Sequence, residues 1–260
     1  MELSFWLEIT EGRFITALLI FARLGGVLFS APLLSSHSVP TPIRVGLAAF
    51  FSLLLTPLLG ATHASNLPLL AVGLAKEFLV GLVLGWVASL MFSSVQMAGE
   101  WLDVQSGFQM AQLFNPMFQM GGGPLGNLKY ILSGMIFLSV GGHAMILRAA
   151  AESFRISPPG ALVIGVGTIT DWFSFLTQAL WIAIQLAAPV GVTLFMTELA
   201  LSIVNRALPQ LNVLMLSLPL KAILAVVALS VAIVPLSHAL ALLFADFGSV
   251  LVSALRILKG

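Results

Sequence analysis

Long apolar stretches restrict the fold of this chain more than any other feature. The segments 172–196 and 222–245 contain no charged residue, and each is longer than the roughly 20 residues that a helix needs to cross a bilayer core. Only 8% of the 260 residues are charged and 59% are hydrophobic, whereas soluble proteins average about 25% charged residues. The sequence therefore predicts an all-α membrane protein that forms a single domain over residues 1–260.

Further apolar stretches bring the expected number of membrane spans to about six. The other four cover residues 14–34, 45–59, 69–98 and 128–147. Several of the six are interrupted by proline or glycine, for instance at Pro189 and Pro235, which predicts broken, tilted helices packed against partner subunits. Gly81 and Gly85 lie four residues apart in the third span, a small-residue pattern that lets helices approach closely.

Ionisable residues lie inside the first and third expected spans. Arg23 is in the middle of the first, and Lys76 and Glu77 interrupt the third. A charged side chain at mid-membrane costs roughly 3 kcal/mol or more on insertion scales. We therefore expect these side chains to face protein, water or each other.

Several classes of function find no support in the sequence. A formal net charge of +1 and the lack of a basic stripe argue against nucleic-acid binding. Cysteine is absent and the four histidines are not spaced four apart, so we expect no metal and no other cofactor. No nucleophile–base set is recognisable, so the chain is not expected to be an enzyme. The acidic amino terminus is expected to be retained, and the Lys and Arg bias between loops slightly favours cytoplasmic termini.

The stretch 98–127 is neither a clean span nor a soluble loop, and it is the most promising functional region. Its methionines and phenylalanines precede a triple glycine, a composition that suits an adaptable apolar seal because thioethers repack easily and apolar constrictions exclude water. The glycines are expected to act as a hinge. The predicted plug or gate residues are Gly107, Phe108, Met110, Phe114, Met117, Phe118, Met120, Gly121, Gly122 and Gly123.

Alternative interpretations of this region remain open. Helical spacing places Gln96, Glu100 and Asp103 on one face with Gly107. The expected polar residues near the pore are Gln96, Glu100, Asp103 and Gln105. Glu100 and Asp103 suit a proton relay in a small secondary transporter or channel, or a polar face packed against a neighbouring subunit. The methionines suit a plug or simple core filling. Gly121, Gly123 and Gly126 match G-x-G-x-x-G but follow no strand, which argues against a dinucleotide site.

Four segments, in order along the chain, are similar to the FliR family of flagellar biosynthetic proteins. They are RLGGVLFSAPLLSSHSVPTPIRVGLA (23–48), AGEWLDVQSGF (98–108), FLSVGGHAMIL (137–147) and LALSIVNRALPQLNVLMLSLPLK (199–221). Injectisome export-gate proteins share much of this pattern. The pairs Asn205-Arg206 and Pro209-Gln210 favour the flagellar branch.

The resemblance implies a subunit of the export gate of the flagellar type III secretion apparatus, in the bacterial inner membrane at the basal body. Such subunits assemble as helical hairpins with homologous FliP- and FliQ-type subunits, adjoin an FlhB-type subunit, and pass unfolded flagellar proteins outward. Residues 1–147 would correspond to a FliP-like part and 148–260 to a FliQ-like part.

The resemblance also implies roles for individual residues. The loop 107–123 would project into the pore as a plug. Charged and polar residues would pair within the chain or at subunit interfaces, and Arg206 has a lipid-interface anchor as its alternative role. The expected structural or interface residues are Arg23, Lys76, Glu77, Asn205, Arg206, Pro209 and Gln210.

Overall fold

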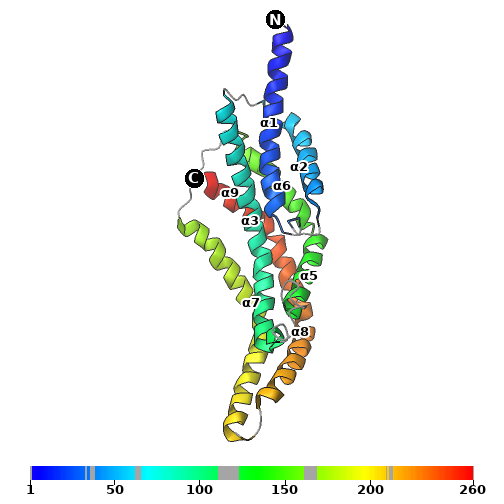
Figure 1. Cartoon of the computed structure of the whole chain (residues 1–260), viewed down its shortest axis with the longest axis vertical. Helices are drawn as coiled ribbons and strands as arrows, with labels where there is room; N and C mark the ends of the chain where they lie inside the picture. The colour runs from blue at the N-terminus through cyan, green and yellow to red at the C-terminus, as the bar shows by residue number, and fades with distance from the viewer. Residues whose placement is uncertain are drawn as a thin grey trace. The chain divides into compact units, whose positions relative to one another are not determined.

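The computed structural model describes residues 2–32, 34–35, 39–61, 66–110, 123–160, 169–208, 210 and 213–259. Within these residues every regular element is a helix (Figure 1). The helices are α1 (Glu2–Ser30), α2 (Thr41–Leu55), the short 3-10 helix η1 (Thr56–Leu58), α3 (Leu67–Ser106), α5 (Pro124–Ser139), α6 (Gly142–Ile156), α7 (Ile169–Ala207), α8 (Val213–Ala245) and α9 (Phe247–Lys259).

The lengths and composition of these helices confirm the prediction of an all-α membrane protein. Five helical stretches of the described chain are long and apolar enough to cross a membrane. A sixth arises if α5 and α6, which meet at a bend of 65°, are counted as one broken span. The bend falls at Gly141, whose φ of 79° lies in the left-handed region that glycine tolerates. The expected fourth span is therefore two helices.

Internal prolines have less effect on the helices than the sequence suggested. Pro189 does not end α7, and Pro219 and Pro235 both lie inside α8. Each proline removes one backbone hydrogen bond, and neighbouring groups can satisfy the freed carbonyl. Pro124, which follows the triple glycine, begins α5, where its missing N–H has no helical partner to lose.

The chain forms two compact units, neither of which is continuous in sequence. The first contains Met1–Leu90, Gly141–Phe175 and Asp246–Gly260, and the second contains Met91–Val140 and Leu176–Ala245. Helices α3 and α7 contribute residues to both. The expected correspondence of 1–147 and 148–260 to two partner families is a statement about homology, and it stays a prediction.

In the first unit, α1 packs against α2, and α6 packs against α9 (Figure 1). Helix α3 approaches α1 so closely that a Cβ atom placed on Gly81 would overlap the carbonyl oxygen of Arg23, and one on Gly85 would overlap the Ser30 hydroxyl. The close helix contact predicted from the spacing of these two glycines is confirmed.

In the second unit, an aromatic cluster joins α3, α5 and α8. The ring centroid of Phe92 lies 5.0 Å from that of Phe137 and 5.1 Å from that of Phe244, and the latter two rings are 5.2 Å apart. Such distances suit tilted and edge-to-face contacts. The cluster fixes the three helices against each other in the second half of α3, which ends just before the predicted plug segment.

Candidate functional site

The structure describes both ends of the predicted plug segment 107–123. Its first residues continue from α3, and Gly123 precedes α5. The residues between them, 111–122, lie outside the described part of the chain. They include six of the predicted plug residues: Phe114, Met117, Phe118, Met120, Gly121 and Gly122.

Asp103 connects the two ends of this segment. Its side chain is buried, with Oδ1 accepting a hydrogen bond from the Leu125 amide at 2.9 Å and Oδ2 accepting one from the Gly126 amide at 2.8 Å. These amides lie in the first turn of α5. The residue at the N-cap position of α5 is Gly123, which makes no side-chain hydrogen bond to them. The first amides of a helix lack helical partners and attract negative charge. A residue of α3 therefore caps α5.

The glycines at the two ends of the segment, Gly107 and Gly123, each have a structural reason to be glycine. Gly107 has φ of 85° where α3 ends, a conformation that side chains rarely adopt. Gly123 is buried, and a Cβ atom there would overlap the Asp103 carboxylate. Gly123 is thus a packing position against Asp103, while a hinge within the preceding glycines stays a prediction.

Lys129 is a second buried charge near the start of α5. Only 1% of it is exposed, and its Nζ donates a hydrogen bond of 3.1 Å to the backbone carbonyl of Leu186 in α7. Leu186 lies three residues before Pro189, whose missing N–H leaves the carbonyl of the preceding residue, Gln185, without its helical donor. The sequence analysis did not single out Lys129. Its position inside the apolar stretch 128–147 was the available signal.

The predicted polar face of α3 divides into separate parts. Gln96 donates a hydrogen bond of 2.8 Å to the exposed Glu100, whereas Asp103 is buried and bound to α5. Gln105 has a buried Oε1 without a hydrogen-bond partner in the structure. Glu100 and Asp103 therefore bond to different groups and do not bond to each other.

In the first unit, Arg23 and Glu77 form a buried ion pair. The Nε of Arg23 donates to Oε2 of Glu77 at 2.5 Å, and both side chains are almost fully buried. Further hydrogen bonds run from Arg23 to the Ser153 hydroxyl and the Ser157 carbonyl, and from the Gly160 amide to Glu77. The expectation that charges inside the spans face each other is confirmed for this pair. It joins α1, α3, α6 and the turn after α6.

The remaining predicted interface residues lie on the surface of the chain. Lys76 is exposed on α3, and Asn205 and Arg206 are exposed in the last turn of α7. Gln210 is exposed as well, and Pro209 lies outside the described residues. A cation in a last helical turn favours the negative end of the helix dipole. The contacts that these residues make with other subunits stay a prediction.

The described side chains include no group of three or more histidines and carboxylates that could hold a metal ion. The site consists instead of buried charges that bind backbone groups, at the start of α5 and within α7. Such contacts fix the positions of helices relative to each other.

Comparison with known proteins gives the family. Residues 14–247 match the family described as bacterial export proteins, family 1. The flagellar biosynthetic protein FliR of Bacillus subtilis (strain 168) is 34% identical over 208 residues, which cover 78% of this chain and 80% of the relative. FliR of Aquifex aeolicus (strain VF5) is 30% identical over 245 residues, covering 92% and 94%.

A relative from another system is also similar. Yop proteins translocation protein T of Yersinia pestis is 33% identical over 156 residues, covering 58% of this chain and 59% of the relative. The family match spans nearly all of the helices described above, and two FliR proteins align over most of their own length. The chain therefore belongs to the bacterial export proteins of family 1, the family that includes these FliR proteins.

Proposed function

We propose that this chain is a subunit of the export gate of a flagellar type III secretion apparatus. With FliP- and FliQ-type subunits it forms the channel through which unfolded flagellar proteins leave the cell, and it adjoins an FlhB-type subunit. The gate lies in the bacterial inner membrane at the flagellar basal body. The names of the FliR relatives and the five to six membrane-type helices support this assignment.

The chain also supplies a plug, residues 107–123, that helps to close the channel. The observation that carries this proposal is the Asp103 cap, which binds the start of α5 to the end of α3. The cap holds the two ends of the proposed plug at one place. Apolar side chains in a constriction exclude water and ions, and thioethers adapt to a passing chain.

Exposed apolar faces in the second unit support assembly with other membrane helices. Large side chains along α7 and α8 are well exposed, including Trp181 at 60%, Ile203 at 70% and Val231 at 76%. In a membrane, such faces are covered by lipid or by partner helices, which associate through close packing and polar contacts. The exposed Asn205 and Arg206 at the end of α7 provide polar groups for such contacts.

The plug is tested by removing its thioethers in the assembled gate. We expect the double substitution Met117→Ala/Met120→Ala to raise ion leakage across the membrane when the chain is co-expressed with FliP- and FliQ-type subunits. Met135→Ala is the matched control, because Met135 is 65% exposed on α5 and lies outside the plug. Unchanged leakage and secretion in the double variant would show that these residues do not seal the channel.

Assembly is tested separately by native mass spectrometry of the tagged chain expressed beside FliP- and FliQ-type subunits. We expect a discrete hetero-oligomer that contains this chain. A stable monomer or homo-oligomer that ignores both partners would contradict the gate assignment and favour a small transporter. The geometry gives little support to that alternative, because Asp103 binds two backbone amides and Glu100 binds Gln96.

The second candidate is a gate subunit of an injectisome. The similarity to Yop proteins translocation protein T favours it, but that match covers 58% of the chain, against 92% for the Aquifex FliR. Complementation distinguishes the two. If the flagellar assignment is correct, we expect the chain to restore motility in a host that lacks its own FliR. Rescue of injectisome secretion alone would contradict the flagellar assignment.

A further inference from the structure

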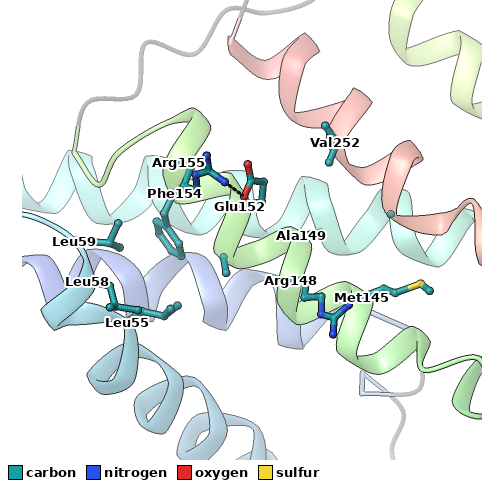
Figure 2. A pocket seen from close by; sticks show the side chains of 12 residues that line it. Leu55, Leu58, Leu59, Met145, Arg148, Ala149, Glu152, Phe154, Arg155 and Val252 are labelled. Atoms are coloured by element: carbon teal, nitrogen blue, oxygen red, sulfur yellow. Dashed lines mark hydrogen bonds and ion pairs between the residues drawn. The ribbon is translucent and has the colours of Figure 1, made fainter.

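A pocket of about 710 Å³ lies within the first unit, between the end of α2 with η1, helix α6 and helix α9 (Figure 2). This volume is within the range of sites that hold small organic ligands, roughly 300–1,000 Å³. The plug proposal does not use this pocket, and its residues belong neither to the Arg23–Glu77 pair nor to the Asp103 cap, apart from Phe154, whose ring contacts Arg23.

Most of the pocket wall is apolar and comes from all three sides. It is lined by Leu55, Leu58, Leu59, Met145, Phe154 and Val252. Phe154 is almost fully buried, whereas Leu58 is 77% exposed. A wall of branched and flexible apolar side chains with an exposed edge suits a long hydrocarbon chain that enters from the surrounding membrane.

Three charged residues of α6 also line the pocket: Arg148, Glu152 and Arg155. Spacings of four and three residues place them along one face of the helix. Arg155 donates a hydrogen bond of 3.1 Å to Glu152, as Figure 2 shows. Arg148 is exposed and makes no hydrogen bond or ion pair within the described chain. The pocket therefore carries one positive charge in excess.

We propose that this pocket binds an anionic phospholipid, with an acyl chain against the apolar wall and the phosphate at Arg148 and Arg155. Basic pockets between membrane helices bind anionic head groups, and arginine matches phosphate oxygens with paired donors. The excess positive charge selects an anionic lipid over a zwitterionic one. The proposal does not depend on the plug, because no described residue of 107–123 lines the pocket.

The charge arrangement gives two substitutions with opposite expected effects. Arg148→Gln removes the unpaired cation, so it lowers the affinity for an anionic lipid by about fivefold, the effect typical of one basic residue near an anionic surface. Glu152 competes with the lipid phosphate for Arg155. Glu152→Gln therefore raises the affinity for the anionic lipid by a similar factor.

The apolar wall is tested at Gly248, which lines the pocket at the start of α9. A Cβ atom at Gly248 would meet no other atom within 4 Å, so a side chain can begin there without overlapping the fold, and Gly248→Leu is chosen to occupy part of the pocket. We expect it to displace anionic and zwitterionic lipids alike. Gly46→Leu is the matched control, because a Cβ at Gly46 also meets no atom within 4 Å and Gly46 does not line the pocket.

The experiment is native mass spectrometry of the full chain with its partner subunits, purified in mild detergent and titrated with phosphatidylglycerol or phosphatidylcholine. We expect the unsubstituted chain to retain phosphatidylglycerol in preference to phosphatidylcholine. Retention of phosphatidylglycerol should fall in Arg148→Gln and rise in Glu152→Gln. Retention of both lipids should fall in Gly248→Leu and stay unchanged in Gly46→Leu. Equal retention of the two lipids would overturn the proposal. So would retention that is unchanged in Arg148→Gln and Gly248→Leu, the result expected if a segment of a partner subunit fills the pocket.

Discussion

The two compact units use buried charge in different ways. In the first unit, Arg23 and Glu77 are paired directly with each other, and their remaining polar atoms bind Ser153, Ser157 and Gly160. In the second unit, Asp103 and Lys129 are also buried and of opposite charge, yet each binds backbone groups. Asp103 binds two amides of α5, and Lys129 binds a carbonyl of α7.

The difference indicates what each cluster does. A closed ion pair between helices leaves few polar atoms unsatisfied and resists rearrangement, because breaking it would leave an uncompensated buried charge. Asp103 binds amides of a helix N-terminus that lack helical partners. Lys129 binds the carbonyl of Leu186, next to Gln185, whose carbonyl has no helical donor because Pro189 lacks an N–H. The first cluster stabilises one unit, and the second fixes the base of the predicted plug.

The largest expected effect is at Arg23. Replacing it with methionine leaves Glu77 buried without its partner, and we expect the free energy of unfolding to fall by about 3–5 kcal/mol, the usual cost of breaking a buried pair. The measurement is denaturant unfolding of the purified chain in mild detergent.

The matched control removes both charges. The double variant Arg23→Met/Glu77→Leu should recover much of the lost stability, because replacement of a whole buried pair by apolar side chains is often nearly neutral. A double variant as unstable as the single one would show that the hydrogen bonds to Ser153 and Gly160, rather than the ion pair, stabilise this unit.

The next effect is at Asp103. Asp103→Ala leaves two first-turn amides of α5 without a partner, and we expect a loss of about 2–3 kcal/mol in unfolding free energy, together with increased ion leakage through the assembled gate. Glu100→Ala is the control, because Glu100 is exposed one turn away on the same helix, and surface substitutions usually change stability by less than about 0.5 kcal/mol. Equal effects of the two variants would remove the assigned role of the cap.

A smaller effect is expected at Lys129. Lys129→Met retains the length of the side chain but removes the donor to the Leu186 carbonyl, which costs about 1 kcal/mol. Because Pro189 leaves the carbonyl of Gln185, next to Leu186, without its helical donor, the two positions should be coupled. In a double-mutant cycle with Pro189→Ala, we expect a measurable interaction energy. Strict additivity would show that Lys129 and the proline act independently.

The smallest expected effect is at the contact between Lys221 and Glu198, which joins α8 and α7 at 2.5 Å. The Glu198 side chain is 56% exposed, and ion pairs of this kind contribute about 0–1 kcal/mol. Lys221→Met should therefore change the unfolding free energy least of these variants. A loss as large as that of Arg23→Met would contradict the distinction between buried and exposed pairs.

Sequence reasoning predicted some of these contacts and missed others. The pairing of charges within the spans was expected because an isolated charge is costly in a membrane, and Arg23 with Glu77 confirms it. The partner of Asp103 was not foreseen, because Leu125 and Gly126 are more than twenty residues away and the contact uses only their backbone. Lys129 was missed for a similar reason, since its acceptor is a carbonyl in another helix.

The sequence by itself determined the class of this protein, its helices and its family. Apolar length and the scarcity of charge require membrane helices, because every backbone group in lipid must be satisfied within the segment. The tertiary structure alone decided which backbone groups the buried charges bind, and that Pro124 begins a helix while Pro189 lies within one. Backbone amides and carbonyls are the same in every residue, so only the packing of helices selects which of them a charge will meet.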